Sequence, residues 1–137
     1  MDKYINILVI DDNFKTQNGL KEILSENGTN ILISKSYEEA LTIVSRKKIG
    51  IIILNIDTET PKNITYIKEV SLIQNTYLIS LTNNEYKGIK SVKGLNKGAV
   101  DYITLPLTPN LIKAKVDVFK SLYFKAVSYT HLTLPTN

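Results

Sequence analysis

The chain of 137 residues contains no cysteine and no tryptophan, and its one histidine is His131. The lack of cysteine excludes disulfides, zinc sites with thiolate ligands and thiol catalysis, and it leaves the cellular compartment open. No apolar run approaches the ~20 residues that a membrane-spanning helix needs. Lys3 and Tyr4 follow Met1 with no signal peptide pattern, so we expect a cytoplasmic protein without a membrane partner.

Arginine is also scarce, since Arg46 is the one arginine among 17 basic residues, and the formal net charge is only +4. Nucleic-acid binding needs basic residues clustered with arginine or aromatic side chains. The lysines are instead spread over predicted helix faces, so we expect no nucleic acid to bind this domain itself. Lys87, Lys90, Lys93 and Lys97 recur at helical spacing, and we interpret them as a solvent-exposed face rather than a docking site.

Short, β-branched apolar runs alternate with segments of helical spacing along the chain. The runs predict strands over residues 4–10, 30–34, 49–54, 77–81 and 100–104. Helices are predicted over residues 14–27, 37–44, 64–73, 85–97 and 110–125, with Ser36 and Glu39 at the spacing of a capping box. Short connections between alternating strands and helices force the strands to run parallel. We therefore expect an α/β fold, a doubly wound five-stranded parallel sheet flanked by five helices.

The third predicted strand is an unbroken apolar run that stops at polar residues, Asn55 and Asp57. Such a run is typical of a central strand that is buried on both faces. In parallel sheets, ligands bind at the carboxyl ends of the strands. Because side chains alternate along a strand, Asn55 and Asp57 are expected on one face, with Asp57 about 6.6 Å farther out. These two residues are the first candidates for a reactive site.

Two adjacent acidic residues, Asp11 and Asp12, follow the first predicted strand. Adjacent carboxylates repel each other, a bound divalent cation relieves this repulsion, and hard oxygen ligands suit Mg²⁺. The alternative is that one of the two caps the next helix. Thr82 ends the fourth strand and Leu105 follows the fifth, so we expect these strand ends to line one pocket with the acidic pair.

Together these segments resemble the receiver domain of two-component response regulators. The resemblance covers nearly all of residues 4–125, and it is carried by Ile7–Asn13, by Leu81–Thr82 and above all by residues 93–106, which include Gly-Ala-Val-Asp-Tyr-Ile-Thr-Leu-Pro. It implies a flavodoxin-like fold of the receiver type. It also implies a site in which an acidic pair binds Mg²⁺ and an aspartate ending the third strand accepts a phosphoryl group from a histidine kinase.

The resemblance further implies a Thr or Ser and a Lys that contact the phosphoryl oxygens, and an aromatic residue that changes rotamer with the switch. Asp11 and Asp12 match the metal pair, and Thr82 matches the hydroxyl residue. Tyr102 matches the aromatic residue, and Pro106 matches the proline that follows the lysine. These assignments rest on the family motif and not on spacing alone.

Two positions depart from the family pattern: the phosphoacceptor position is Asn55, and the lysine position is Leu105. An amide oxygen is a poor nucleophile and a weak, uncharged metal ligand, so Asn55 should not accept a phosphoryl group. Leu105 cannot supply the positive charge that a lysine brings to the phosphoryl oxygens. The two changes agree with each other, because a lysine without the acceptor carboxylate would be partly buried and unpaired.

Asp57 is the alternative acceptor, because it lies four residues before Pro61, which is the spacing of the family. A shift of two residues keeps the side chain on the same face, so alternation cannot decide between the two positions. The separation from Asp12 fits the family register better for Asn55. We assign the acceptor position to Asn55 and retain Asp57 as the second candidate.

These observations predict a cytoplasmic pseudo-receiver that is not an enzyme and acts through protein contacts, with a histidine kinase or an output domain as partner. Magnesium binding is expected to be weak or absent. One alternative is a phosphorelay receiver that uses Asp57. A second, from another class, is an α/β phosphatase-type hydrolase that uses Asn55 and Asp57. A nucleotide-binding module ranks last, because no glycine-rich loop follows any strand.

Residues 127–137 differ abruptly in composition from the lysine-rich segment before them, since they contain no Lys, Arg, Asp or Glu. They resemble one reading frame of a transposon adapter used for sequencing libraries. We therefore expect a receiver-like domain at residues 1–126 and a non-native tail at residues 127–137. On this interpretation the native protein continues past residue 126, and its output domain is missing.

Overall fold

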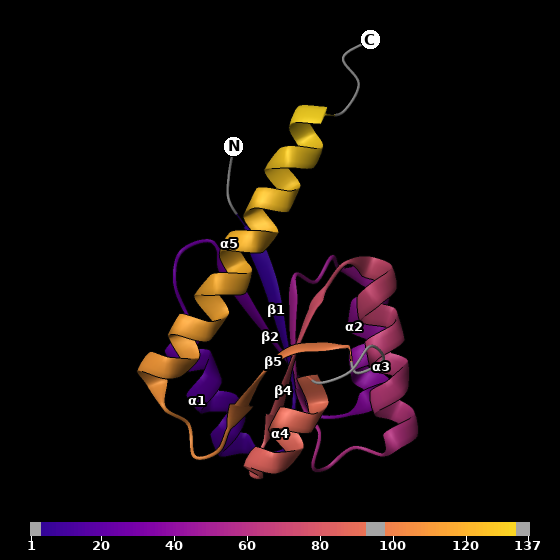
Figure 1. Cartoon of the computed structure of the whole chain (residues 1–137), viewed down its shortest axis with the longest axis vertical. Coiled ribbons are helices and arrows are strands. Elements are labelled where there is room, and N and C mark those ends of the chain that lie inside the picture. The colour runs from indigo at the N-terminus through magenta and orange to yellow at the C-terminus, as the bar shows by residue number, and fades with distance from the viewer. Residues whose placement is uncertain (1–3, 93–97, 134–137) are drawn as a thin grey trace.

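The computed structural model describes residues 4–92 and 98–133, with residues 128–133 as backbone only. Strands and helices alternate along the whole of the described chain (Figure 1). In chain order the elements are β1 (Ile5–Ile10), α1 (Phe14–Leu24), β2 (Thr29–Ser34), α2 (Tyr37–Arg46), β3 (Ile51–Asn55), α3 (Pro61–Gln74), β4 (Tyr77–Thr82), α4 (Glu85–Val92), β5 (Ala99–Thr104) and α5 (Pro109–Thr133). The predicted α/β fold is confirmed.

All five strands are parallel and form one sheet in the order β2-β1-β3-β4-β5. The chain moves outward from β1 to β2 and then returns to the other side of β1 with β3, so the strand order reverses between β1 and β3. Ligands bind at such a reversal, beyond the carboxyl ends of the strands. Ile10 pairs with Leu54 across it, so the next residues, Asp11 and Asn55, lie at the same edge of the sheet.

Each face of the sheet is covered by its own helices. Figure 1 shows α1 and α5 on one side of the strands and α2 and α3 on the other. On β3, Ile51 and Ile53 belong to the core beneath α1 and α5, whereas Ile52 and Leu54 belong to the core beneath α2 and α3. β3 is therefore buried on both faces, which is why its sequence is uninterrupted by polar residues.

Side-chain caps set the starts of several helices. Ser36 precedes α2, and its hydroxyl accepts a hydrogen bond from the Glu39 N–H at 3.1 Å, as the predicted cap requires. α3 begins earlier than its apolar spacing predicts, because Thr60 accepts from the Asn63 N–H at 3.1 Å and Pro61 occupies the first helical position. Proline is favoured there because its fixed φ suits a helix and its missing N–H would have no partner.

α4 spans Glu85–Val92, and the rest of its predicted range, including Lys93 and Lys97, lies outside the described residues. The last helix differs most from its predicted bounds. α5 does not end near Lys125 as predicted but continues to Thr133 and projects beyond the sheet (Figure 1). No glycine or proline follows Lys125 until Pro135, so the local sequence contains no stop signal. That residues 127–137 are non-native stays a prediction.

One buried lysine anchors α5 to the opposite end of the domain from the strand ends described above. Lys120, 9% exposed, contacts the Glu26 carboxylate and donates to Thr29 Oγ1 at 2.8 Å. Thr29 is the first residue of β2, so this anchor lies at the amino-terminal edge of the sheet. None of the helices within residues 4–92 and 98–133 is both long and apolar enough to span a membrane.

Candidate functional site

Asp11 is buried at the end of β1, with 3% of its surface exposed. Its Oδ1 accepts a hydrogen bond from the Asn13 N–H at 3.1 Å, while its Oδ2 has no hydrogen-bond partner among the residues that the structure describes. Asp12 beside it is exposed. The alternative in which either aspartate caps α1 is wrong, because Asn13 is the cap and accepts from the Thr16 N–H at 3.0 Å.

Asn55 ends β3 and is 6% exposed. Its Oδ1 accepts a hydrogen bond from the Asp57 N–H at 2.8 Å. This bond, from a side chain to the backbone two residues on, forms a turn that bends the chain away from the extended conformation. Residues 56–59 follow as a bend, so the alternation of side chains does not extend to Asp57. The prediction that Asn55 and Asp57 share one strand face was wrong for this reason.

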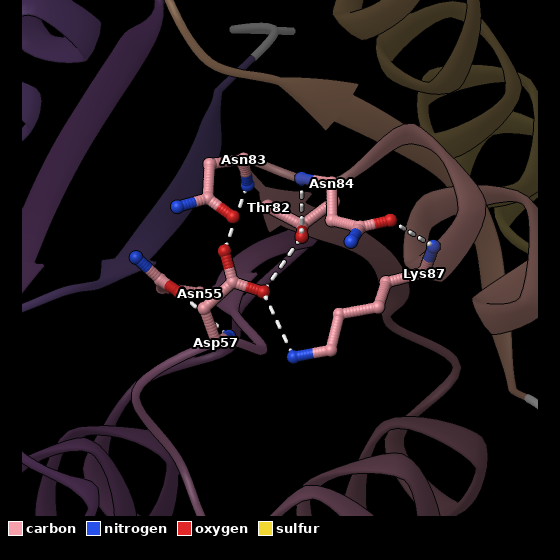
Figure 2. Close-up of polar contacts among 6 residues, drawn as sticks. All are labelled: Asn55, Asp57, Thr82, Asn83, Asn84 and Lys87. Carbon is pink, nitrogen blue, oxygen red and sulfur yellow. Dashed lines mark hydrogen bonds and ion pairs between the residues drawn. The ribbon is translucent and has the colours of Figure 1, made fainter.

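Asp57 points toward the end of β4 and the start of α4 (Figure 2). Its Oδ1 accepts from Thr82 Oγ1 at 2.7 Å, and its Oδ2 accepts from the Asn83 N–H at 2.7 Å. The Lys87 Nζ lies 3.4 Å from Oδ1. Burial raises the pKa of Asp57, but the three donors favour its charged form more strongly, so the pKa lies below the ordinary value of an aspartate.

The acidic pair and Asp57 do not form one group: Asp11 contacts Asn13 after β1, whereas Asp57 contacts Thr82 and Asn83 at the end of β4. Within residues 4–92 and 98–133, no three acidic, histidine or cysteine side chains come together as a metal-binding group. Asp57 therefore does not join Asp11 and Asp12 as a third carboxylate ligand. The unpaired, buried Oδ2 of Asp11 fits a bound cation. The acidic pair offers two carboxylate ligands, a set that suits an Mg²⁺ ion which keeps several of its waters.

Leu105, which we predict to occupy the lysine position of the family, has an apolar side chain. Its side chain packs against the core beneath α1 and α5, and its N–H donates to the Thr82 carbonyl at 2.9 Å. The peptide bond to Pro106 is cis. Among the ion pairs of the described residues, the cation that contacts the carboxylate of Asp57 is instead Lys87, from α4. Sequence reasoning treated Lys87 as part of an exposed face and missed this role.

Two further contacts at the start of α4 were also missed, although one had a signal. Asn84 stands three residues before Lys87, the spacing of a helix cap, and its Oδ1 accepts from the Lys87 N–H at 3.0 Å. The Asn84 N–H in turn donates to Thr82 Oγ1 at 3.1 Å. The backbone N–H of Asn83 carries no side-chain signal at all, so its bond to Asp57 could not be read from residue types.

Tyr102, the predicted aromatic switch residue, lies on β5 and packs against Gly88 of α4. Its hydroxyl donates to Glu85 Oε2 at 2.5 Å, and this bond is the main reason that its pKa is raised, with burial adding to it. The Lys115 Nζ lies 4.6 Å from the centre of its ring. The ring covers Gly88, where an added Cβ would meet Tyr102 Cδ2 at 2.4 Å.

Gly88→Ala is therefore expected to destabilise the protein by about 1–3 kcal/mol, because the new methyl group overlaps the Tyr102 ring. Alanine is otherwise the better helix residue by about 1 kcal/mol. In a Tyr102→Ala background the same change should thus be neutral or stabilising. Urea unfolding of the wild type, both single variants and the double variant measures this coupling. Additive effects of the two changes would contradict the packing of Tyr102 on Gly88.

The lowered pKa of Asp57 predicts a specific pH dependence of stability. A carboxyl whose pKa is lower in the folded than in the unfolded state stabilises the fold above its unfolded pKa, and this stability is lost as the pH falls through the folded pKa. At neutral pH, Asp57→Asn should cost about 1–3 kcal/mol through its weakened hydrogen bonds. This difference from the wild type should be constant above about pH 5 and should shrink as the pH falls below about 4, the ordinary pKa of an aspartate. A difference that stays constant below about pH 4, measured by urea unfolding, would contradict the prediction.

Three comparisons place this geometry among known proteins. A family model described as the response regulator receiver domain matches residues 7–117. The chain is 29% identical over 104 residues to the aerobic respiration control protein ArcA of Escherichia coli (strain K12), covering 76% of this chain and 43% of that protein. It is 30% identical over 115 residues to the transcriptional regulatory protein YvrH of Bacillus subtilis (strain 168), covering 81% and 47%. The chain thus spans less than half the length of these curated relatives.

The comparison with solved structures agrees with the sequence comparisons. The structure of a response regulator from Thermotoga maritima superposes with a TM-score of 0.75 and 26% sequence identity. That match covers 86% of this chain and 98% of the other. The arrangement of five parallel strands and five helices is therefore that of known response regulator structures.

Proposed function

Because the chain belongs to the response regulator receiver family, we propose that it is a pseudo-receiver, a two-component signalling module that acts through protein contacts without accepting a phosphoryl group. The observation that carries the proposal is Asn55 at the buried end of β3. This position adjoins Asp11 across the point where the strand order reverses, which is where a ligand is expected. A carboxamide stands there in place of a carboxylate.

The chemistry of Asn55 supports this proposal directly. A phosphoryl acceptor needs an anionic oxygen that can attack phosphorus, whereas the Asn55 Oδ1 belongs to a neutral amide. That oxygen also accepts the Asp57 N–H at 2.8 Å, which withdraws electron density from it further. Asn55 therefore acts here as a structural residue that ends the strand.

The acidic pair retains the means to bind a cation. Asp11, with its unpaired buried oxygen, and the exposed Asp12 would hold Mg²⁺, and the ion when bound would polarise a phosphoryl oxygen and screen the two charges from each other. Without a third carboxylate or an acceptor aspartate at position 55, we expect the affinity for Mg²⁺ to be low. Without a bound cation, Asp11 holds the N–H of Asn13, the cap of α1.

Asp57 is a less suitable acceptor than its charge alone indicates. Both of its carboxylate oxygens already accept short hydrogen bonds, from Thr82 and from Asn83. These donors lower the pKa of Asp57 and with it the nucleophilicity of the oxygens. Leu105 leaves the lysine position without a charge that could stabilise a transferred phosphoryl group.

We infer that the module works in the cytoplasm and is not an enzyme. Its partner is a protein, either a histidine kinase or an output domain. The curated relatives are named as transcriptional and respiratory control proteins, and an output domain that binds DNA is one form such a partner takes. The family assignment does not favour the alternative of a phosphatase-type hydrolase.

Incubation with a small acyl phosphate and Mg²⁺, followed by intact-mass spectrometry, tests the proposal. We expect no mass increase of about 80 Da, the signature of one phosphoryl group, in the wild type. The positive control is a phosphorylatable receiver treated in parallel. An adduct on the wild type that disappears in Asp57→Ala would overturn the proposal and establish the alternative receiver that uses Asp57.

A further inference from the structure

Two hydrogen-bond donors at the end of β4 bind the carboxylate of one residue of the same chain, Asp57. Thr82 Oγ1 donates to Asp57 Oδ1 at 2.7 Å and accepts from the Asn84 N–H at 3.1 Å. The Asn83 N–H donates to Asp57 Oδ2 at 2.7 Å. Figure 2 shows the carboxylate of Asp57 between these groups. Thr82 is 0% exposed, so its hydroxyl has no water to exchange for these partners.

The carboxylate of Asp57 also has a cationic partner, Lys87, and this lysine lies on α4 rather than after β5, where the family carries its lysine. The Lys87 Nζ lies 3.4 Å from Asp57 Oδ1 and belongs to α4, whereas the usual lysine position, Leu105, is apolar. The side chain of Asp57 is 16% exposed and that of Lys87 is 52% exposed. The carboxylate is therefore held mainly by its two short hydrogen bonds, and Lys87 adds a weaker, partly screened attraction.

We propose that Asp57 is a built-in anion that fastens the bend after β3 to the start of α4 and holds α4 in one position without phosphoryl transfer. This inference rests on the proposed function, because an Asp57 that accepted a phosphoryl group could not be a permanent partner of Thr82 and Asn83. Because this negative charge belongs to the chain itself, it is always present at the site and does not depend on a kinase.

The contacts of Asp57 also affect α4, the helix whose surface we propose a protein partner would contact. Lys87 and Glu85 both lie in the first turn of α4, and Glu85 accepts the Tyr102 hydroxyl at 2.5 Å. Asp57 is thus connected through α4 to Tyr102, the residue at the aromatic switch position. A module built in this way presents one constant α4 surface, and its regulation lies in its abundance or in its partner.

Amide hydrogen exchange measured by NMR tests the fastening. In Asp57→Ala we expect the Asn83 amide to exchange at least about tenfold faster than in the wild type, because a charge-assisted hydrogen bond is lost. The amides of α4 should also exchange faster. Lys87→Met should raise the rates only about two- to threefold, in keeping with a partly exposed ion pair. The matched controls, Asp117→Asn on the exposed face of α5 and Lys62→Met on α3, should leave these rates unchanged.

A second measurement needs no variant and so does not depend on the folding of Asp57→Ala. In isotope-labelled wild type, a scalar coupling should be detected between the Asn83 amide nitrogen and the Asp57 carboxyl carbon. Absence of this coupling, or an Asn83 exchange rate that Asp57→Ala leaves unchanged, would overturn the inference. Failure of the pseudo-receiver proposal is detected separately, as a phosphoryl adduct in the mass spectrum.

Discussion

Asn55→Asp combined with Leu105→Lys is expected to make the protein phosphorylatable, with a mass increase of about 80 Da after incubation with an acyl phosphate and Mg²⁺. The first change supplies an anionic nucleophile at the buried edge beside Asp11 and adds a third carboxylate for the metal. The second supplies the missing cation. A lysine stem can cover the core surface that Leu105 now covers, while its ammonium group reaches the site.

Single variants and a third change make this result interpretable. Leu105→Lys alone should give no adduct, because no carboxylate acceptor stands at position 55. Adding Asp57→Asn to the double variant should leave the adduct in place if position 55 is the acceptor. A folded double variant that binds Mg²⁺ but acquires no phosphoryl group would count against our assignment of the acceptor position.

Ile53→Ala is expected to lower the free energy of unfolding by about 2–5 kcal/mol. Ile53 is 0% exposed and lies at the centre of the sheet, where it pairs with Val9 on β1 and Ile79 on β4. Truncation leaves a cavity beside β3, and the hydrogen bonds of β3 to β1 and β4 prevent the strands from moving to fill it. Because a domain of this size is stable by only about 5–15 kcal/mol, the loss is a large fraction of the total.

Ile73→Ala is the matched control, because it removes the same atoms from a side chain that is 80% exposed on α3. We expect it to change the free energy of unfolding by less than about 0.5 kcal/mol. Urea denaturation of both variants under identical conditions gives the comparison. Equal losses in the two variants would contradict the central position of β3 in the core.

The sheet was predictable because each strand carries its own signal. A run such as residues 49–54, apolar on both faces, indicates a central strand, and the alternation of strands with helices determines that they are parallel. The bounds of the helices were harder to predict. α3 starts at Pro61 and α5 continues to Thr133, in the first case because a cap and a proline precede the apolar spacing and in the second because no residue stops the helix.

The candidate site was predictable by position but not by orientation. Motif spacing located Asn55, Asp57 and Thr82 at neighbouring strand ends, yet the turn formed by Asn55 decides where Asp57 points. That turn depends on one side-chain hydrogen bond, and residue types alone leave such a bond undetermined. Lys87 was misinterpreted for a similar reason. Its ion pair depends on where the bend after β3 places Asp57, and helical spacing does not reveal that position.

The anchoring of α5 by Lys120 fixes this helix at the edge of the sheet that is remote from the candidate site. α5 starts beyond the carboxyl ends of the strands, near the candidate site, and Lys120 ties it to Glu26 and Thr29 at the amino-terminal edge. A strand of six residues separates these edges by about 20 Å. The part of α5 that follows Lys120 therefore lies on the side of the domain remote from Asp57. A displacement of that part would first break the contacts of Lys120 with Glu26 and Thr29, and it could reach the strand ends only along α5.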